Sequence, residues 1–459
     1  MEIKILGFFS LFTILRTIVK IINRDDLTCV DVILLSYTIY FAIIPIVGDV
    51  SFIGSDMIIN SSLSHWYVFI VYNIFAYSLV LFDYNYCKKA NTDDNVYFLT
   101  RFIRNWINNL NLNKQWIYLT VTLLILQIII LSSNFQTIDK TILGSMDDIR
   151  KASSFSFFSL FTGGGGTTIR IVTIFMLSSI VFNKDKELYW NNKIIVNILI
   201  VTQILLLFFL NRTYFFESIL IFLLLFYGCQ KEYISNANII RMALLLSVIV
   251  VFIFPVISVI RTTTRYMTSK GLNKDLSNVI ITSYNRYTSG KINITKADNK
   301  DSRMWGCYSI VAKSIFCDYE GNGEIISNAI SKGIPKVIYP SKSITGSQLI
   351  IEKKFKTMGD VADSVLLAGI AENRILGPIL ASFFFLILVY IYNLFYRIFK
   401  LFTKYELYVP LILSSLFCWL LRVEHSIDGL VSGFIGLSIL NICMFVYVKI
   451  VGYLLKIRL

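Results

Sequence analysis

The chain has 459 residues, of which 56% are hydrophobic and only 16% charged, and its mean hydropathy is +0.67. Soluble proteins usually have about 45–50% apolar and about 25% charged residues, so the composition excludes ordinary soluble, disordered and collagen-like proteins. The net charge of +14 does not by itself indicate nucleic-acid binding, because basic residues of membrane proteins gather in cytoplasmic loops. Long apolar runs instead predict an all-α polytopic membrane protein.

The first apolar stretch, residues 3–22, is interrupted by Lys4, Arg16 and Lys20. Charges inside an apolar run favour an amphipathic helix on the membrane surface over a helix that crosses it. We therefore expect residues 1–27 to form an N-terminal amphipathic segment on the cytoplasmic side. A cleaved signal peptide fits the sequence less well, since no small-residue cleavage site follows the stretch.

About ten transmembrane helices are expected after this segment, most of them near the ~20 residues that a bilayer core requires. Their predicted ranges are 28–48, 65–84, 116–134, 166–183, 192–210, 213–229, 238–260, 374–396, 406–422 and 426–448. The first seven make up a membrane bundle over 28–260, and the last three belong to 374–459 with the carboxy-terminal tail.

Lysine and arginine residues set the expected orientation. They are concentrated in the connections 85–115, 184–193 and 397–405, whereas the connection 49–64 has none. Basic residues favour the cytoplasmic side of a membrane, and their alternation holds across the predicted spans. The sequence therefore predicts that both termini are cytoplasmic.

One connection is much longer than the others: residues 261–373, which the alternation places on the outer side between the seventh and eighth spans. Its apolar residues recur at spacings of three and four, which predicts short helices that fold back over the membrane face. Connections of this length are usually functional, so we expect a large extracytoplasmic loop that contributes to the site.

Arginines recur at the predicted outer ends of the spans. An ionisable side chain at this depth is costly and indicates a functional site, although a single arginine can also extend its charge to the interface. Guanidinium groups match phosphate oxygens with paired hydrogen bonds, so a group of them favours a lipid pyrophosphate as ligand. These outward arginines are Arg170, Arg212, Arg261, Arg265, Arg374 and Arg422.

Acidic residues and one histidine share this level. Glu217 lies five residues after Arg212 inside the sixth predicted span, which predicts a buried ion pair between the two. Glu372, His425 and Asp363 are candidates for the general base that a hydroxyl acceptor would need. The alternative is that the carboxylates only neutralise nearby arginines.

Two other patterns carry little functional signal. The glycine run 163–166 lacks the Gly-Lys-Ser/Thr ending of a nucleotide-binding loop, so a re-entrant or close-packed turn is favoured, with an anion cradle as the alternative. The seven cysteines and two histidines show no metal-binding spacing, and neither a metal nor a cofactor is expected.

Three short stretches carry a resemblance to a known family. The turn 211–213 (Asn-Arg-Thr) joins two long spans, residues 333–342 contain Ile-Pro-Lys and then Pro-Ser-Lys, and residues 363–377 lead into the eighth span. In these stretches and in its layout, the chain resembles the Wzy-type oligosaccharide repeat unit polymerases of bacterial O-antigen, capsule and exopolysaccharide pathways. It departs from their pattern at 372–374 (Glu-Asn-Arg), where the family often has Asn-Phe-Gly.

The resemblance implies a GT-C-like fold and a metal-independent glycosyltransferase in the bacterial cytoplasmic (inner) membrane. The donor would be a growing glycan on polyprenyl pyrophosphate, such as undecaprenyl pyrophosphate, and the acceptor a single lipid-linked repeat unit. A flippase and a chain-length regulator are the implied protein partners. The product is left open between the O-antigen of lipopolysaccharide, a capsule and an exopolysaccharide.

For such a reaction Glu372, His425 and Asp363 are the candidate catalytic residues. Two alternative functions stay open: an O-antigen ligase, for which an external histidine such as His425 would matter, and a flippase, against which the long external connection argues. The candidates for binding pyrophosphate are Arg170, Arg212, Arg261, Arg265, Lys336, Lys342 and Arg422.

Overall fold

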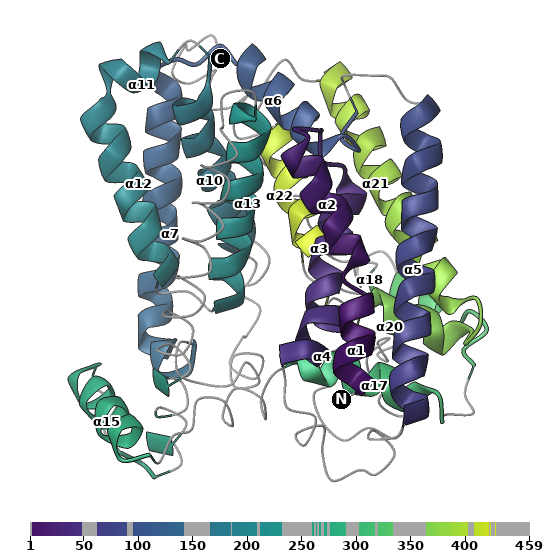
Figure 1. Ribbon diagram of the computed structural model, residues 1–459. Helices are drawn as coiled ribbons and strands as arrows, with labels where there is room; N and C mark the ends of the chain where they lie inside the picture. Colours follow the sequence, from purple (N-terminus) through teal and green to yellow (C-terminus); the bar gives the residue numbers. More distant parts are fainter. Residues whose placement is uncertain are drawn as a thin grey trace. The chain divides into compact units, whose positions relative to one another are not determined.

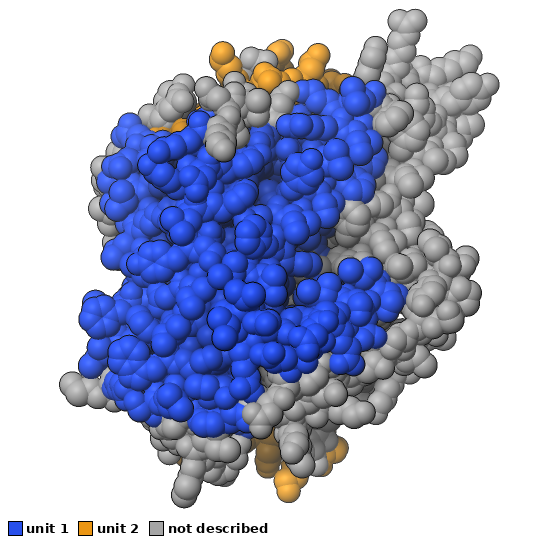
Figure 2. All heavy atoms as spheres, turned by 90° about the vertical axis from the view of Figure 1, so that its right-hand side faces the viewer, with its two compact units in different colours: residues 1–102, 302–459 blue, residues 103–301 orange. Residues whose placement is uncertain are grey.

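The computed structural model describes most of the chain as helices. The described residues are 2–47, 62–89, 95–141, 166–184, 186–208, 212–231, 276–290, 303–316, 320–333, 364–402 and 408–421, with isolated positions between 259 and 272 and at 423 and 427. Within these ranges no strand occurs. The chain forms two compact units, 1–102 with 302–459 and 103–301, coloured separately in Figure 2.

The unit 1–102 with 302–459 is called unit 1. Its N-terminal helices are α1 (Glu2–Phe9), α2 (Phe12–Ile22), α3 (Cys29–Thr38), the π-helical turn η1 (Ile39–Ile43), α4 (Ile44–Val47) and α5 (Ser62–Lys89). Its later helices are α17 (Arg303–Ser314), α18 (Glu324–Gly333), α20 (Val365–Glu372), α21 (Gly377–Phe402) and α22 (Tyr408–Leu421). Helix α6 (Leu99–Asn109) carries the chain from unit 1 into the second unit.

Aromatic packing forms the centre of unit 1. The rings of Tyr37 on α3, Phe75 on α5 and Phe385 on α21 lie 4.8–6.1 Å apart by their centroids, two of the three pairs in edge-to-face contact. Such ring pairs add about 0.5–1.5 kcal/mol each to the burial of their apolar area. The Ser36 hydroxyl donates to the Leu420 carbonyl oxygen at 2.9 Å, which joins α3 to α22.

The outer faces of the long helices are apolar as well. Among the residues that the structure describes, three helical segments are long and apolar enough to cross a membrane: Glu2–Ile22, Ser62–Lys88 and Gly377–Leu401. Large hydrophobic side chains are exposed along these helices at spacings of three and four. A helix that is apolar on all sides is stable where lipid or protein surrounds it. On α21 these are Leu380, Phe383, Ile387, Tyr390, Leu394, Ile398 and Leu401. The all-α class is therefore confirmed for the described residues, and these helices suggest a membrane protein, while the count of ten spans stays a prediction.

The N-terminal helices differ from the surface helix that the sequence predicts. The Glu2 carboxylate accepts hydrogen bonds at 2.6 Å from Ser62 Oγ and Trp66 Nε1 at the start of α5, and Arg16 contacts Asp83 near its end. Helices α1 and α2 thus run parallel to α5 over its length, as Figure 1 shows.

Two of the three charges that suggested a surface helix have buried partners instead, because Arg16 and Lys20 form salt bridges with Asp31 and Asp83. The packing of α1 and α2 along α5 thus differs from the surface helix predicted for 1–27. It also follows that Glu2 lies at the same end of unit 1 as Ser62, whereas the sequence had placed them on opposite sides of the membrane.

Within the described residues, unit 2 (103–301) contains the end of α6 and six further helices. These are α7 (Lys114–Thr141), α10 (Gly166–Phe182), α11 (Glu187–Asn191), α12 (Lys193–Phe208), α13 (Arg212–Gln230) and α15 (Leu276–Thr288). The helices α7, α10 and α12 share one hydrophobic cluster: Ile117, Leu124, Leu177, Ile180, Val196 and Leu199.

The helix directions in unit 2 separate its charges. Contacts between the start of α7, the end of α10 and the start of α12 place these three termini at one end of unit 2. Asn183 after α10 also donates to the carbonyl oxygens of Ile107 and Leu110 at 2.7 and 3.1 Å, which holds the end of α6 there. The lysines at or beside these termini are Lys114, Lys184, Lys186 and Lys193.

Candidate functional site

A buried ion pair joins α10 to α13 in unit 2. Arg170 Nη2 donates to Glu217 Oε2 at 2.8 Å, and the two side chains are 3% and 4% exposed. Removing one partner of such a pair typically costs about 3–5 kcal/mol, because the other charge is left buried. The sequence predicted Glu217 as the counter-ion of Arg212. The structure pairs it with Arg170, and the side chain of Arg212 lies outside the described residues.

The same two helices are parallel. Beyond the ion pair, Phe182 near the end of α10 contacts Phe222 and Phe226 on α13, with ring centroids 6.0 and 5.6 Å apart. Gly166 and Arg212, the first residues of α10 and α13, therefore lie at the same end of unit 2, opposite the lysines. Helix N-termini carry partial positive charge and unpaired backbone N–H groups, so two of them side by side favour an anion.

A polar layer continues from this pair across α7. Gln127 Nε2 donates to Thr173 Oγ1 at 2.7 Å, and both residues are buried. Gln203 on α12 is also buried, and neither polar atom of its amide has a hydrogen-bond partner among the residues that the structure describes. The sequence analysis missed these glutamines. The available signal was a polar amide inside an apolar predicted span. Such a group is costly in lipid unless it forms a hydrogen bond with a neighbouring helix or with a ligand.

Glu372 has a different environment from the one expected of a free general base. Its carboxylate accepts hydrogen bonds from the backbone N–H groups of Gly323 at 2.5 Å and Ile326 at 2.7 Å, at the N-terminus of α18. Gly321 donates to the carbonyl oxygen of Ala371 at 2.8 Å. Glu372 is only 3% exposed, so it docks α18 against α20. Its catalytic role stays a prediction.

The turn before α18 needs glycine for this contact. A Cβ atom on Gly321 would lie 2.6 Å from the Glu372 Oε2 atom, and Gly323 has φ +95°. The first contact leaves no space for a side chain, and the second conformation is strained for any residue other than glycine. The glycines therefore permit the carboxylate to reach the helix N-terminus, where its negative charge also complements the helix dipole.

The stretch 364–377 that leads into α21 is a tight helical corner. Ser364 accepts a hydrogen bond from the Leu367 amide at 3.1 Å and so caps α20, while Asn373 accepts from the Leu376 amide at 2.8 Å. Gly369 and Gly377 lie so close together that a Cβ atom on either would collide with the backbone carbonyl of the other. Close packing therefore explains the two glycines of the stretch 363–377, one of the three stretches in which the chain resembles the polymerase family.

Unit 1 contains a second charged cluster that the sequence analysis did not predict. Lys20 Nζ lies 2.7 Å from Asp31 Oδ2, and Arg16 contacts both Asp31 and Asp83. The Thr28 hydroxyl donates to Asp83 Oδ1 at 2.9 Å. The two cations and two carboxylates balance, so this cluster joins α2 to α3 and α5 without favouring an anion.

Tyr97 completes this cluster from the segment before α6. Its hydroxyl donates to Asp83 Oδ1. Burial, with the negative charge of Asp83 beside it, raises the pKa of the Tyr97 hydroxyl well above its usual range. The phenol therefore stays protonated and remains a donor over the whole physiological range of pH.

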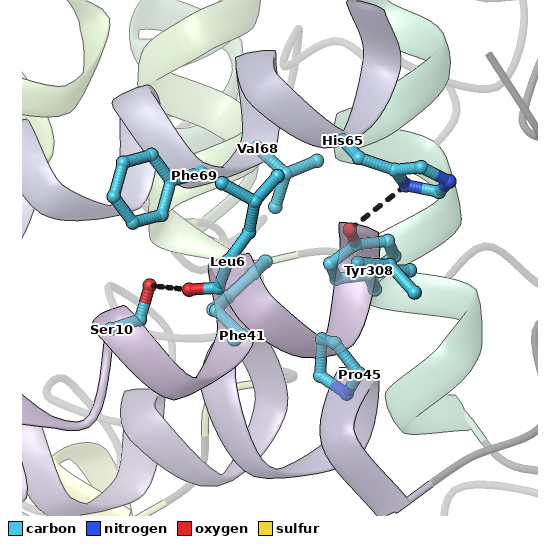
Figure 3. Close-up of a pocket in the computed structure, with 10 residues that line it drawn as sticks. Leu6, Ser10, Phe41, Pro45, His65, Val68, Phe69 and Tyr308 are labelled. Carbon is cyan, nitrogen blue, oxygen red and sulfur yellow. Dashed lines mark hydrogen bonds between the residues drawn. The ribbon is translucent and has the colours of Figure 1, made fainter. Parts of the chain in front are cut away.

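A small cavity lies where the long connection meets α1 and α5 (Figure 3). The ring of His65 points toward Tyr308 of α17, and His65 Nδ1 lies 3.2 Å from the Tyr308 hydroxyl oxygen. The cavity has a volume of ≈ 10 Å³, about enough for one water molecule and far too small for a sugar. We interpret it as a docking contact between α17 and the bundle.

The other predicted site residues lie outside the described residues. They are Arg261, Arg265, Lys336, Lys342, Asp363, Arg422 and His425. The structure therefore describes the surroundings of Arg170 and Glu372 and the backbone of Arg212. Comparisons of the chain with protein-family models, with curated proteins and with solved structures found no match.

Proposed function

We propose that this protein polymerises polyprenyl-pyrophosphate-linked oligosaccharide repeat units into a bacterial surface polysaccharide. The acceptor's terminal sugar hydroxyl attacks the anomeric carbon of the donor glycan. A new glycosidic C–O bond forms, the bond from the anomeric carbon to the phosphate oxygen breaks, and polyprenyl pyrophosphate leaves with the electron pair. The hydroxyl proton passes to a base, for which Glu372, His425 and Asp363 remain the candidates.

One observation carries the proposal: the parallel packing of α10 and α13, which gives one end of unit 2 two helix N-termini and Arg212. A leaving pyrophosphate gains negative charge as its bond to the sugar breaks, and fixed positive groups aimed at it stabilise that change. Arg170 is already held by Glu217, so it fixes the relative position of the two helices. Arg212 is the residue we assign to the phosphates.

The distribution of charge supports an outward-facing site. Lysines mark the opposite end of unit 2, and basic residues favour the cytoplasmic side of a membrane. In unit 1, the ends of α5 and α21 carry Lys88 and Lys400, and Glu2 lies at the opposite end. We therefore propose that the helix N-termini of α10 and α13, the helices of the long connection and the N-terminus face outward, and that the carboxy-terminus is cytoplasmic.

The glycan profile of a strain that lacks the protein tests the function. A polymerase predicts loss of long chains, with single repeat units retained on their acceptor or lipid carrier. Full-length polymer that accumulates on polyprenyl pyrophosphate would instead identify a ligase. Single repeats trapped on the cytoplasmic side would identify a flippase and remove the catalytic interpretation, and restoration by the wild-type gene is the control.

A further inference from the structure

Helix α15 presents an exposed apolar stripe. Ile280, Tyr284 and Tyr287 follow one another at helical spacings of four and three, and Ile281 extends the same face. All of them are exposed, Tyr284 by 68% and Ile281 by 58%. A helix on the surface of a soluble domain would turn these side chains toward its core.

The opposite face of α15 is mixed in polarity. Val279 and Ser283 are buried, and the Arg286 guanidinium lies over the ring of Tyr266 with its central carbon 3.8 Å from the ring centroid. The inward face is therefore no more apolar than the exposed one, which carries two isoleucines and two tyrosines. Four large apolar side chains left outside favour an apolar medium around that face.

The rest of unit 2 indicates what that medium is. Its spans α7 and α12 also expose isoleucine, leucine and tyrosine, which lie in lipid when the spans cross a membrane. Figure 1 shows α15 beyond the end of α7 that lies opposite the lysines, and inclined to it. Tyrosines concentrate at the boundary between lipid and water, because their rings are apolar and their hydroxyl groups are polar.

We infer that α15 is a membrane-interface anchor that inserts Ile280, Ile281, Tyr284 and Tyr287 between lipid headgroups and acyl chains. Its polar flank, which includes the exposed residue Asn278, faces water. The anchor holds the start of the long connection against the bilayer. This inference does not depend on the proposed glycosyl transfer, since it rests on the exposed side chains of α15 and on its place beyond the end of α7.

A photocrosslinking experiment on the full-length chain tests the anchor. The protein carries p-benzoylphenylalanine in place of Tyr284 and is placed in nanodiscs of phosphatidylethanolamine and phosphatidylglycerol. Irradiation is expected to give at least five-fold more lipid adduct, counted by mass spectrometry, than the same probe at Asn278. The latter position is a matched control, because it is exposed on the same helix about 120° away around its axis.

Two outcomes would overturn the inference. Equal, low lipid adduct at both positions would place α15 in water, and cross-links from position 284 to another protein chain would make the stripe a protein interface. Hydroxyl-radical footprinting of the unmodified chain provides a second measurement that needs no substitution. Oxidation of Tyr284 and Tyr287 should be lower in nanodiscs than in delipidated protein, and equal oxidation would also contradict the anchor.

Discussion

The buried charges of the two units differ in how many partners they have and in how exposed they are. In unit 1, Arg16 is 22% exposed by its side chain and shares Asp31 and Asp83 with Lys20, so each charge has several partners. In unit 2, Arg170 and Glu217 are 3% and 4% exposed and joined by a 2.8 Å contact. A shared, partly hydrated cluster tolerates the loss of a member, whereas a deeply buried pair does not. The first arrangement suits a joint between helices, and the second fixes two helix N-termini in place.

The largest effect is expected from Arg212, which begins α13 at the end where we place the pyrophosphate. Arg212→Ala should abolish polymer, because a fixed cation no longer stabilises the leaving group, while protein level and membrane insertion stay normal. Lys193→Ala, at the start of α12 on the opposite end of unit 2, is the control and should leave chain length unchanged. Normal polymer in the Arg212 variant would remove this residue from the site.

Glu217→Gln should cause the largest loss of stability. The substitution leaves the Arg170 charge buried without its carboxylate, at a cost of about 3–5 kcal/mol. Thermal unfolding in detergent, followed by fluorescence-detected gel filtration, measures the loss. The double variant Arg170→Met, Glu217→Leu should recover most of the stability, since apolar side chains of similar volume replace a buried pair well. A single variant as stable as wild type would mean that Arg170 does not depend on Glu217.

Asp83→Asn should destabilise unit 1 less, by about 1–3 kcal/mol. The amide still accepts a hydrogen bond from Thr28 or Tyr97, and both Arg16 and Lys20 keep Asp31 as a partner. The same unfolding assay compares it directly with Glu217→Gln. A larger loss for Asp83→Asn would reverse the contrast between the two units.

The sequence predicted the positions of several helices well and the contacts between charges poorly. Continuous apolar runs fix where helices form, so the predicted spans 166–183 and 213–229 match α10 at Gly166–Phe182 and α13 at Arg212–Gln230. Partners, however, depend on which helices meet. Proximity along the chain suggested Arg212 for Glu217, but the packing of α10 on α13 brings Arg170 to it.

The same limit explains the N-terminal helices. In the sequence, Arg16 and Lys20 resemble the polar face of a surface helix. Only the structure shows that Asp31 and Asp83 are their partners. Asp31 and Asp83 lie in other predicted spans, where a carboxylate requires a cation or a hydrogen-bond donor. Their positions were therefore the available signal for this cluster. Likewise, nothing in the sequence around Glu372 indicated that its carboxylate would cap a helix almost fifty residues earlier.

That cap leads to the smallest effect that we expect. Glu372→Gln removes one of the two acceptors that hold the Gly323 and Ile326 amides and should cost about 0.5–2 kcal/mol, the range for loss of a helix cap. The loss is local, so hydrogen exchange of peptides from α18 should accelerate while exchange in α21 stays unchanged. Glu324→Gln, an exposed change on α18 itself, is the matched control and should leave its exchange slow. If polymer also disappears in the Glu372 variant while α18 stays protected, the carboxylate acts as the base and not only as the anchor of α18.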